Sequence, residues 1–239
     1  MARRSADGSD RIESGNLLAL LIRSPRRTVT LQVNTDLSLV MKAPTDASEP
    51  FLREFLERKR PWVEHHLERM ARIKAAAPEW KDGGRLPFLG RELGLRVEKG
   101  ARARARLAGD SLVVSARDPE DQAEVRAAAE RLFAREAAAS FPAMLDACLA
   151  KAAKRRFPRP TLRVRTMRSR WGSCDASALV ITLNARLMRF RPEVIECVVM
   201  HELAHLKYRR HGPRFYGLLE ELCPEFRELQ AELADVYLE

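Results

Sequence analysis

The feature that most constrains this chain is an apolar helix that carries two histidines one turn apart. Pro192 stands where a helix would begin, and apolar residues recur from there to Leu203 at helical spacing. The sequence His201-Glu-Leu-Ala-His205 lies within this helix. Residues four apart project from the same helical face, so both imidazoles point the same way. Such a helix belongs at the centre of a domain, where its histidines need partners.

The spacing of these histidines predicts a metal site. Two imidazoles so placed can share one Zn²⁺ at about 2.0–2.1 Å each. Glu202 is rotated by about 100° from the first histidine, so it reaches a water held by the metal rather than the metal itself. This is the position of a general base in a zinc-dependent hydrolase. The alternative to a metal site is that both histidines are core residues hydrogen-bonded to the backbone. That arrangement leaves a buried Glu202 without a positive charge nearby, which is unfavourable.

A hydrolytic zinc site needs a third protein ligand and an open fourth position. His211 is the nearest candidate, because Gly212-Pro213 ends the helical run and redirects the chain. The offsets match the metzincin pattern, but Tyr208 replaces its glycine and no methionine follows Met200, so the chain is not a metzincin. The alternative third ligands are carboxylates of the later helices: Glu220, Glu221 and Glu225.

Further motifs carry a family resemblance. They are Arg170-Trp-Gly-Ser-Cys174, Leu183-Asn184, His201-Glu-Leu-Ala-His205, His211-Gly-Pro-Arg-Phe215 and, in the first half, a hairpin, the Trp62 helix and Phe88-Leu-Gly90. With them the chain resembles the YgjP-like metallopeptidases, relatives of the SprT-like and WLM zinc proteases, over about residues 16–239. The resemblance implies a minimal zincin-type domain with His201, His205 and His211 as zinc ligands and Glu202 as general base. Ala185 stands where family members often carry an aromatic residue.

Trp171 and Gly172 are candidate substrate-binding residues, expected to line the cleft near the metal, and a strongly β-like run follows at 178–183. That run could pair with an extended peptide by adding it as a further strand. The expected substrate is therefore a peptide or protein.

The predicted fold class is α+β: a small zincin-like metallopeptidase domain whose active-site helix packs on a short sheet, preceded by a β-hairpin and helix region. The predicted division is a flexible tail at 1–15, an N-terminal β-rich and helical region at 16–117, and a catalytic region at 118–239. Expected elements include a hairpin (28–33 and 37–41), a helix from Ser48 that Pro61 kinks or splits, a helix from Asp118 that restarts at Ser140–Pro142, a strand at 161–167, a loop at 168–174, and helices at 213–222 and 224–237.

Two other functions remain open, because the formal net charge is +10 and a basic surface can attract nucleic acid or nucleotides. The first is a metal-dependent nucleotide phosphoanhydride hydrolase, although no G-x-x-x-x-G-K-[ST] loop is present. The second is a basic nucleic-acid-binding module with a non-catalytic zinc, although structural zinc sites are usually rich in cysteine and none lies nearby at ligand spacing.

The sequence also predicts a cytoplasmic protein with no membrane association. The longest apolar run, Leu17–Ile22, is far shorter than the roughly 20 residues that span a bilayer. The N-terminus lacks the apolar stretch of a secretory signal, and the four cysteines contain no C-x-x-C pair.

Overall fold

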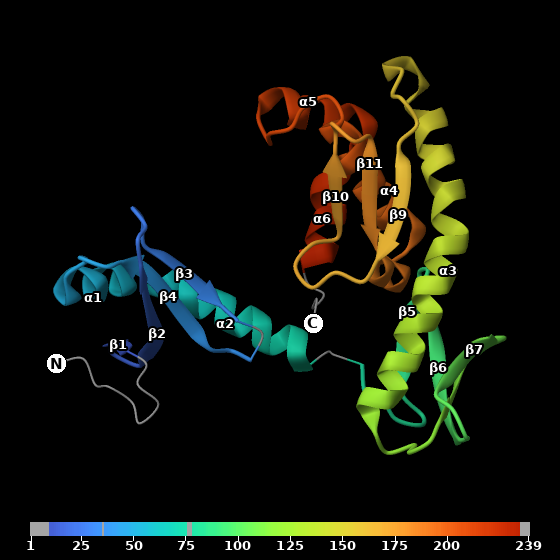
Figure 1. The fold of residues 1–239 in the computed structure, drawn as a ribbon, viewed down its shortest axis with the longest axis horizontal. Coiled ribbons are helices and arrows are strands. Elements are labelled where there is room, and N and C mark those ends of the chain that lie inside the picture. The colour runs from blue at the N-terminus through green and yellow to red at the C-terminus, as the bar shows by residue number, and fades with distance from the viewer. Residues whose placement is uncertain (1–9, 35, 76–77, 235–239) are drawn as a thin grey trace. The chain divides into compact units, whose positions relative to one another are not determined.

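The structure is a computed structural model that describes residues 10–34, 36–75 and 78–234. The chain divides into two compact units between residues 77 and 78 (Figure 1). Both units combine helices with small sheets, which confirms the α+β class. None of the described helices is both long enough and apolar enough to cross a membrane.

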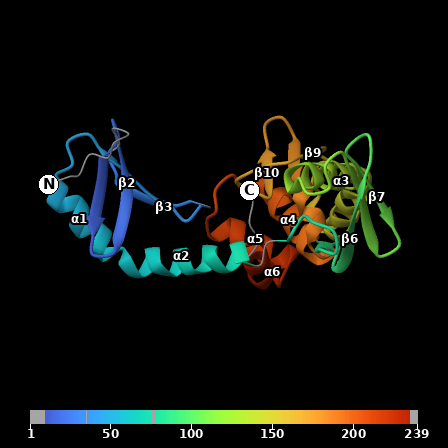
Figure 2. The ribbon, with the colours of Figure 1, turned by 90° about the horizontal axis from the view of Figure 1, so that it is seen from below.

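The N-terminal unit is a four-stranded sheet with helices on one side (Figure 2). Its elements are β1 (Asp10–Ser14), β2 (Leu17–Ser24), β3 (Thr30–Val33), β4 (Leu39–Pro44), α1 (Glu49–Arg58) and α2 (Arg60–Ala75). The strand order is β1-β2-β4-β3, with β2 and β4 parallel. The predicted hairpin is β3–β4, and the predicted helix is split at Lys59, because Pro61 cannot continue α1 but fits the first turn of α2. The predicted tail differs: residues 10–14 form β1, and residues 1–9 lie outside the described part.

The second unit begins with another four-stranded sheet and a long helix. Its elements are β5 (Arg85–Phe88), β6 (Arg91–Lys99), β7 (Arg104–Ala108), β8 (Ser111–Ala116) and α3 (Gln122–Lys151). The side chain of Asp121 caps α3 by accepting from the backbone N–H groups of Ala123 and Glu124. The predicted restart at Ser140–Pro142 is wrong. The helix continues through Pro142. The fully buried side chains of Phe141 and Leu145, before and after the proline, pack in the core and keep both segments of the helix in place.

The remaining elements build a three-stranded sheet and the helices behind it. They are η1 (Ala153–Arg155), β9 (Thr161–Arg165), β10 (Gly172–Asp175), β11 (Val180–Asn184), η2 (Ala185–Arg189), α4 (Pro192–His205), α5 (Pro213–Leu222) and α6 (Phe226–Ala234). The strand order is β10-β11-β9. The predicted loop at 168–174 is partly wrong, since its last residues form β10 against β11. The end of the helix predicted at 224–237 lies outside the described residues.

The boundary between the units differs from the predicted one at residue 117. The sheet β5–β8 shares one continuous core with α3, in which Leu95 and Val114 pack with Val125 and Leu132. Figure 1 shows α3 running from this sheet to the sheet β9–β11. Residues 78–117 therefore belong to the same unit as residues 118–234, because their apolar face packs in that core.

Candidate metal centre

Helix α4 brings the first two histidines together. Most of its apolar residues are buried against the sheet and against α3, α5 and α6, which fixes its rotation. The rings of His201 and His205 then lie on one face, with centroids 4.9 Å apart. The helix ends at His205, and the N–H of Tyr208 still donates to the carbonyl of Ala204 as the chain turns.

His211 returns to these two rings after the turn. Its Nε2 lies 3.1 Å from Nε2 of His201. One ring nitrogen from each of the three histidines falls within 4.8 Å of the others, and among the described residues this is the one such cluster of His, Cys, Asp or Glu side chains. The alternative carboxylates lie elsewhere: Glu220 pairs with Arg227, Glu221 pairs with Arg155, and Glu225 is outside the cluster.

Neighbouring groups orient the rings. Nδ1 of His205 lies 3.0 Å from the carbonyl oxygen of Tyr208, to which it donates, so Nε2 is left with its lone pair. Nδ1 of His201 lies 3.3 Å from the side-chain amide nitrogen of Gln230, on α6. The fully buried ring of Phe215 packs under all three imidazoles at centroid distances of 5.0, 4.6 and 4.7 Å. Sequence reasoning did not identify Gln230, because one polar residue on a distant helix carries no local signal.

Burial favours the neutral form of the two imidazoles on α4. Burial, together with the nearby His205 and His211, lowers the pKa of His201 to about 4. Burial also lowers the pKa of His205. Three imidazoles with converging nitrogens form a donor set for a borderline metal ion such as zinc.

Glu202 is buried beside this cluster and is closely approached by a glycine. Burial raises the pKa of its carboxyl group to about 8, while the positive charge of Arg170 acts in the opposite direction. A Cβ atom added at Gly172 would lie 2.4 Å from Oε1 of Glu202 and 2.8 Å from its Cγ. Only glycine therefore fits at this point of β10 with Glu202 in its present position.

Asn184 holds the loop that leads into β10. It is fully buried at the end of β11, and its side-chain amide donates to the carbonyls of Met167 and Arg170 at 2.9 Å each. Its side-chain oxygen accepts from the backbone N–H groups of Met167 and Arg186. The next residue in the loop, Trp171, is half-buried and packs edge-on against Phe190 at 5.0 Å. Sequence reasoning noted Asn184 as part of a motif but assigned it no role.

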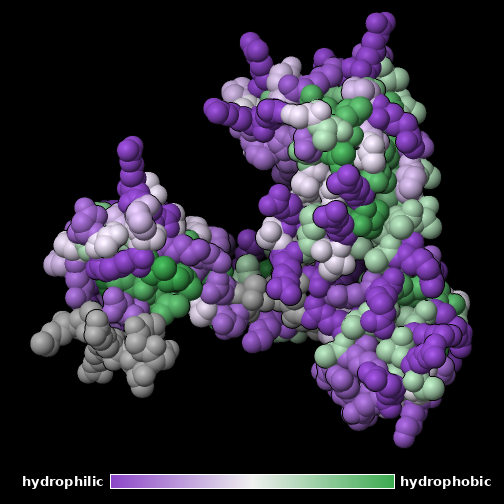
Figure 3. Space-filling model, in the orientation of Figure 1, coloured by the Kyte–Doolittle hydropathy of each residue, from purple (hydrophilic) through white to green (hydrophobic). Residues whose placement is uncertain are grey.

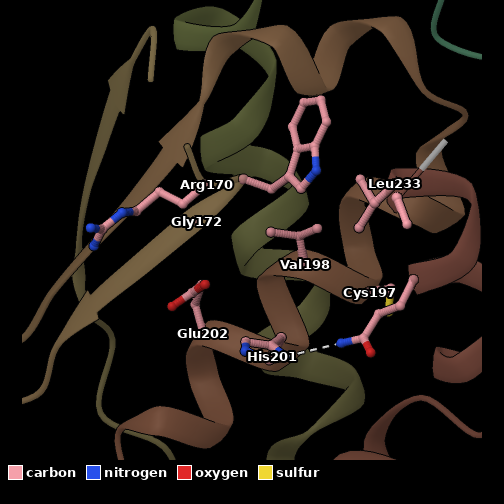
Figure 4. A pocket seen from close by; sticks show the side chains of 10 residues that line it. Arg170, Gly172, Cys197, Val198, His201, Glu202 and Leu233 are labelled. Atoms are coloured by element: carbon pink, nitrogen blue, oxygen red, sulfur yellow. Dashed lines mark hydrogen bonds between the residues drawn. The ribbon is translucent and has the colours of Figure 1, made fainter. Parts of the chain in front are cut away.

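Two cavities meet at His201 and Glu202. One has a volume of about 400 Å³ and is bounded by Trp171, Val198 and Leu233 together with Gln230. Figure 4 shows Val198 and Leu233 facing this space, with His201 and Glu202 at one side of it. The other, of about 790 Å³, is more polar and runs along β10 past His205 and His211: its charged walls are Arg170, Asp175 and Arg209. The predicted residues Trp171 and Gly172 therefore both line the cleft.

The strand predicted to accept a peptide is in the wrong place for that role. β11 pairs with β10 on one side and β9 on the other, so its backbone groups are used within the sheet. β10 is the strand next to the cavities, and it lies at the edge of this sheet in the described part of the chain.

One family description covers most of this chain. The family description "YgjP-like, metallopeptidase domain" matches residues 27–236. The crystal structure of the abylysin zymogen of Pyrococcus abyssi, a metallopeptidase, is 19% identical over 41% of this chain and 98% of its own, with a TM-score of 0.34. That of the jannalysin zymogen of Methanocaldococcus jannaschii, also a metallopeptidase, is 18% identical over 39% and 92%, with a TM-score of 0.34. A search of curated proteins gives no match. Because the family match extends over most of the sequence, the chain belongs to the YgjP-like family of metallopeptidases.

Proposed function

We propose that the protein is a zinc-dependent peptidase in which His201, His205 and His211 hold the metal and Glu202 is the general base. The observation that carries this proposal is the convergence of three imidazole nitrogens beside a buried carboxylate at the meeting point of two cavities.

The three histidines fit zinc. Two ligands bonded to a tetrahedral zinc at about 2.0–2.1 Å lie roughly 3.3 Å apart, and Nε2 of His201 and His211 are 3.1 Å apart. Tyr208 fixes the His205 ring through Nδ1, as outer-shell partners of metal-binding histidines do. When bound, zinc supplies Lewis acidity that lowers the pKa of a coordinated water and polarises a carbonyl group.

Gln230 would orient His201 in the same way. A metal on Nε2 of His201 requires the proton on Nδ1, and the amide oxygen of Gln230 accepts it once the amide turns about its last bond. Gln230 is thus a positioning residue in this proposal.

Glu202 performs the proton transfers. Its carboxylate takes a proton from the attacking water and gives a proton to the departing amine, which restores the starting state. The proton taken from the water in the first step is the one that Glu202 gives to the amine in the second. Gly172 leaves the space that the Glu202 side chain occupies. Asn184 holds the loop that carries Arg170, and the positive charge of Arg170 lowers the pKa of Glu202.

The substrate would lie along β10 as an extended peptide. An edge strand offers backbone donors and acceptors to an added strand, which makes binding largely independent of substrate sequence. The apolar cavity beside Trp171 and Leu233 would take one apolar side chain near the scissile bond, and the polar cavity would take the chain on the other side.

The experiment compares the wild-type protein with Glu202→Gln on two substrates, reduced and alkylated casein and ATP, with and without chelator. We expect zinc-dependent cleavage of casein, a loss of at least about a hundredfold in Glu202→Gln, and unchanged zinc stoichiometry. Full activity in Glu202→Gln would contradict the role of Glu202. Cleavage of ATP alone would make the protein a phosphoanhydride hydrolase. In a parallel titration with DNA, salt-sensitive binding with no hydrolysis of casein or ATP would favour the non-catalytic alternative.

A further inference from the structure

The N-terminal unit repeats the architecture at the start of the second unit. The sheet β1-β2-β4-β3 and the sheet β5-β6-β8-β7 have the same strand order. In each, the outer pairs are antiparallel and the central pair is parallel. Each sheet is followed along the chain by helices. We call the sheet β1–β4 with α1 and α2 the first copy, and the sheet β5–β8 with α3 the second copy.

Corresponding residues keep a constant spacing along the sequence from the last strand into the helix. The pairs are Leu39 and Leu112, Val40 and Val113, Ala43 and Ala116, the helix N-caps Ser48 and Asp121, and Leu52 and Val125. The apolar members of these pairs are buried in both copies. The two copies are therefore directly comparable, position by position.

The face of the sheet opposite the helices differs between the copies. In the first copy Leu18, Leu20 and Ile22 lie on this face, and Leu20 pairs with Val40. In the second copy the residue that pairs with Val113 is Arg96. By the same register, Gly94 and Glu98 correspond to Leu18 and Ile22.

The fold itself does not require apolar residues on this face, because the second copy has the same topology with Arg96 and Glu98. Yet Leu18 is 46% exposed and Ile22 is 42% exposed. Figure 3 shows this apolar surface on the N-terminal unit over β2 and β4. Apolar side chains that gather on one exposed face, where the fold does not require them, indicate an interaction surface.

We propose that this face docks a segment of another polypeptide that carries apolar side chains next to acidic ones. The apolar requirement follows from Leu18, Leu20 and Ile22. The acidic requirement follows from charge complementarity: Arg11 is the neighbour of Leu20 on β1, and Lys42 is the neighbour of Ile22 on β4. Glu13, beside Leu18, is the one acidic residue among the positions that pair with this stripe. The proposal goes beyond peptide hydrolysis and does not depend on it.

The test uses the full chain with Glu202→Gln, so that no peptide is consumed. Three fluorescein-labelled peptides of about 12 residues are titrated by anisotropy: alternating Leu and Glu, alternating Leu and Lys, and alternating Ser and Glu. The variant Leu20→Arg with Ile22→Glu copies the second sheet and keeps the net charge. The variant Leu20→Thr with Ile22→Thr keeps strand-forming residues. Arg96→Ala with Glu98→Ala is the matched control on the second sheet.

We expect the Leu–Glu peptide to bind most tightly and both variants of the first sheet to weaken it at least about tenfold. The control on the second sheet should leave its affinity unchanged. Equal affinity in all variants would overturn the proposal, since binding would then reside in the cleft. A second result would also overturn it: sedimentation shows that the wild type is a dimer and the Leu20→Arg, Ile22→Glu variant a monomer, while the affinity for the peptide is the same in both. The occupant of this face would then be a second molecule of the same protein.

Discussion

Replacing Gly172 by Ala tests whether the close approach of β10 to Glu202 sets the position of this proposed general base. The new Cβ would lie 2.4 Å from Oε1, 2.8 Å from Cδ and 2.8 Å from Cγ of Glu202, where ordinary contacts are 3.4–4 Å. Because Cγ is involved as well as the carboxylate, the side chain must move as a whole, by roughly 1 Å. We expect kcat to fall about a hundredfold and the unfolding free energy to fall by about 1–3 kcal/mol.

The assay measures kcat on casein, zinc affinity, and stability in urea for Gly172→Ala. Zinc affinity should change little, since the three atoms nearest to the added Cβ all belong to Glu202 and none to a histidine. Gly217→Ala is the matched control, because no atom lies within 4 Å of its added Cβ and alanine suits helix α5. A folded Gly172→Ala protein with kcat within about threefold of the wild type, or with zinc affinity and kcat lowered in parallel, would refute the reasoning.

Three further predictions concern the proposed metal centre. His211→Ala should abolish tight zinc binding in a competition titration. His66→Ala, on helix α2 and outside the histidine cluster, should leave it intact. Unchanged affinity in His211→Ala would point to a later glutamate. Gln230→Ala should lower zinc affinity by about tenfold, and Gln230→Glu should restore it because a carboxylate also accepts from Nδ1 of His201; equal losses in both variants would argue against the positioning role. In the metal-free protein, the pKa of Glu202 is raised from 4.5 to about 8, so the folded state holds a proton that the unfolded state has lost. Unfolding free energy should therefore fall as pH rises from 6.5 to 8, by up to about 2 kcal/mol, and the fall should be absent in Glu202→Gln. His201, with a lowered pKa, contributes stability that is lost only as pH falls below 6.5.

Local patterns in the sequence were sufficient for the elements that hold the site. The period of the apolar residues places α4, and Pro192 and Gly212 with Pro213 mark where α4 begins and α5 follows. The relative placement of His201, Glu202 and His205 depends only on helical geometry, so the sequence was sufficient to predict it. His211 was a candidate for the same reason, because the helix had to end before it.

Other features depend on contacts between distant segments. Pro142 suggested a helix break, but Phe141 and Leu145 are buried on either side of it and keep α3 continuous. The loop before Cys174 showed no strand pattern, yet its backbone pairs with β11. Residues 78–117 looked like part of an N-terminal region until their sheet packed on α3.

The sequence by itself determined the chemistry of the candidate site, because residue type and helical period place two imidazoles and a carboxylate on one turn. Tertiary structure decided the rest. It brought His211 to 3.1 Å from His201, set Gly172 against Glu202, and placed Gln230 from α6 behind the cluster. It also showed that two stretches without an obvious sequence repeat share one topology, and that only one of them presents an apolar face. These relations join residues far apart in the chain, and packing of the whole core fixes their distances, which no local pattern encodes.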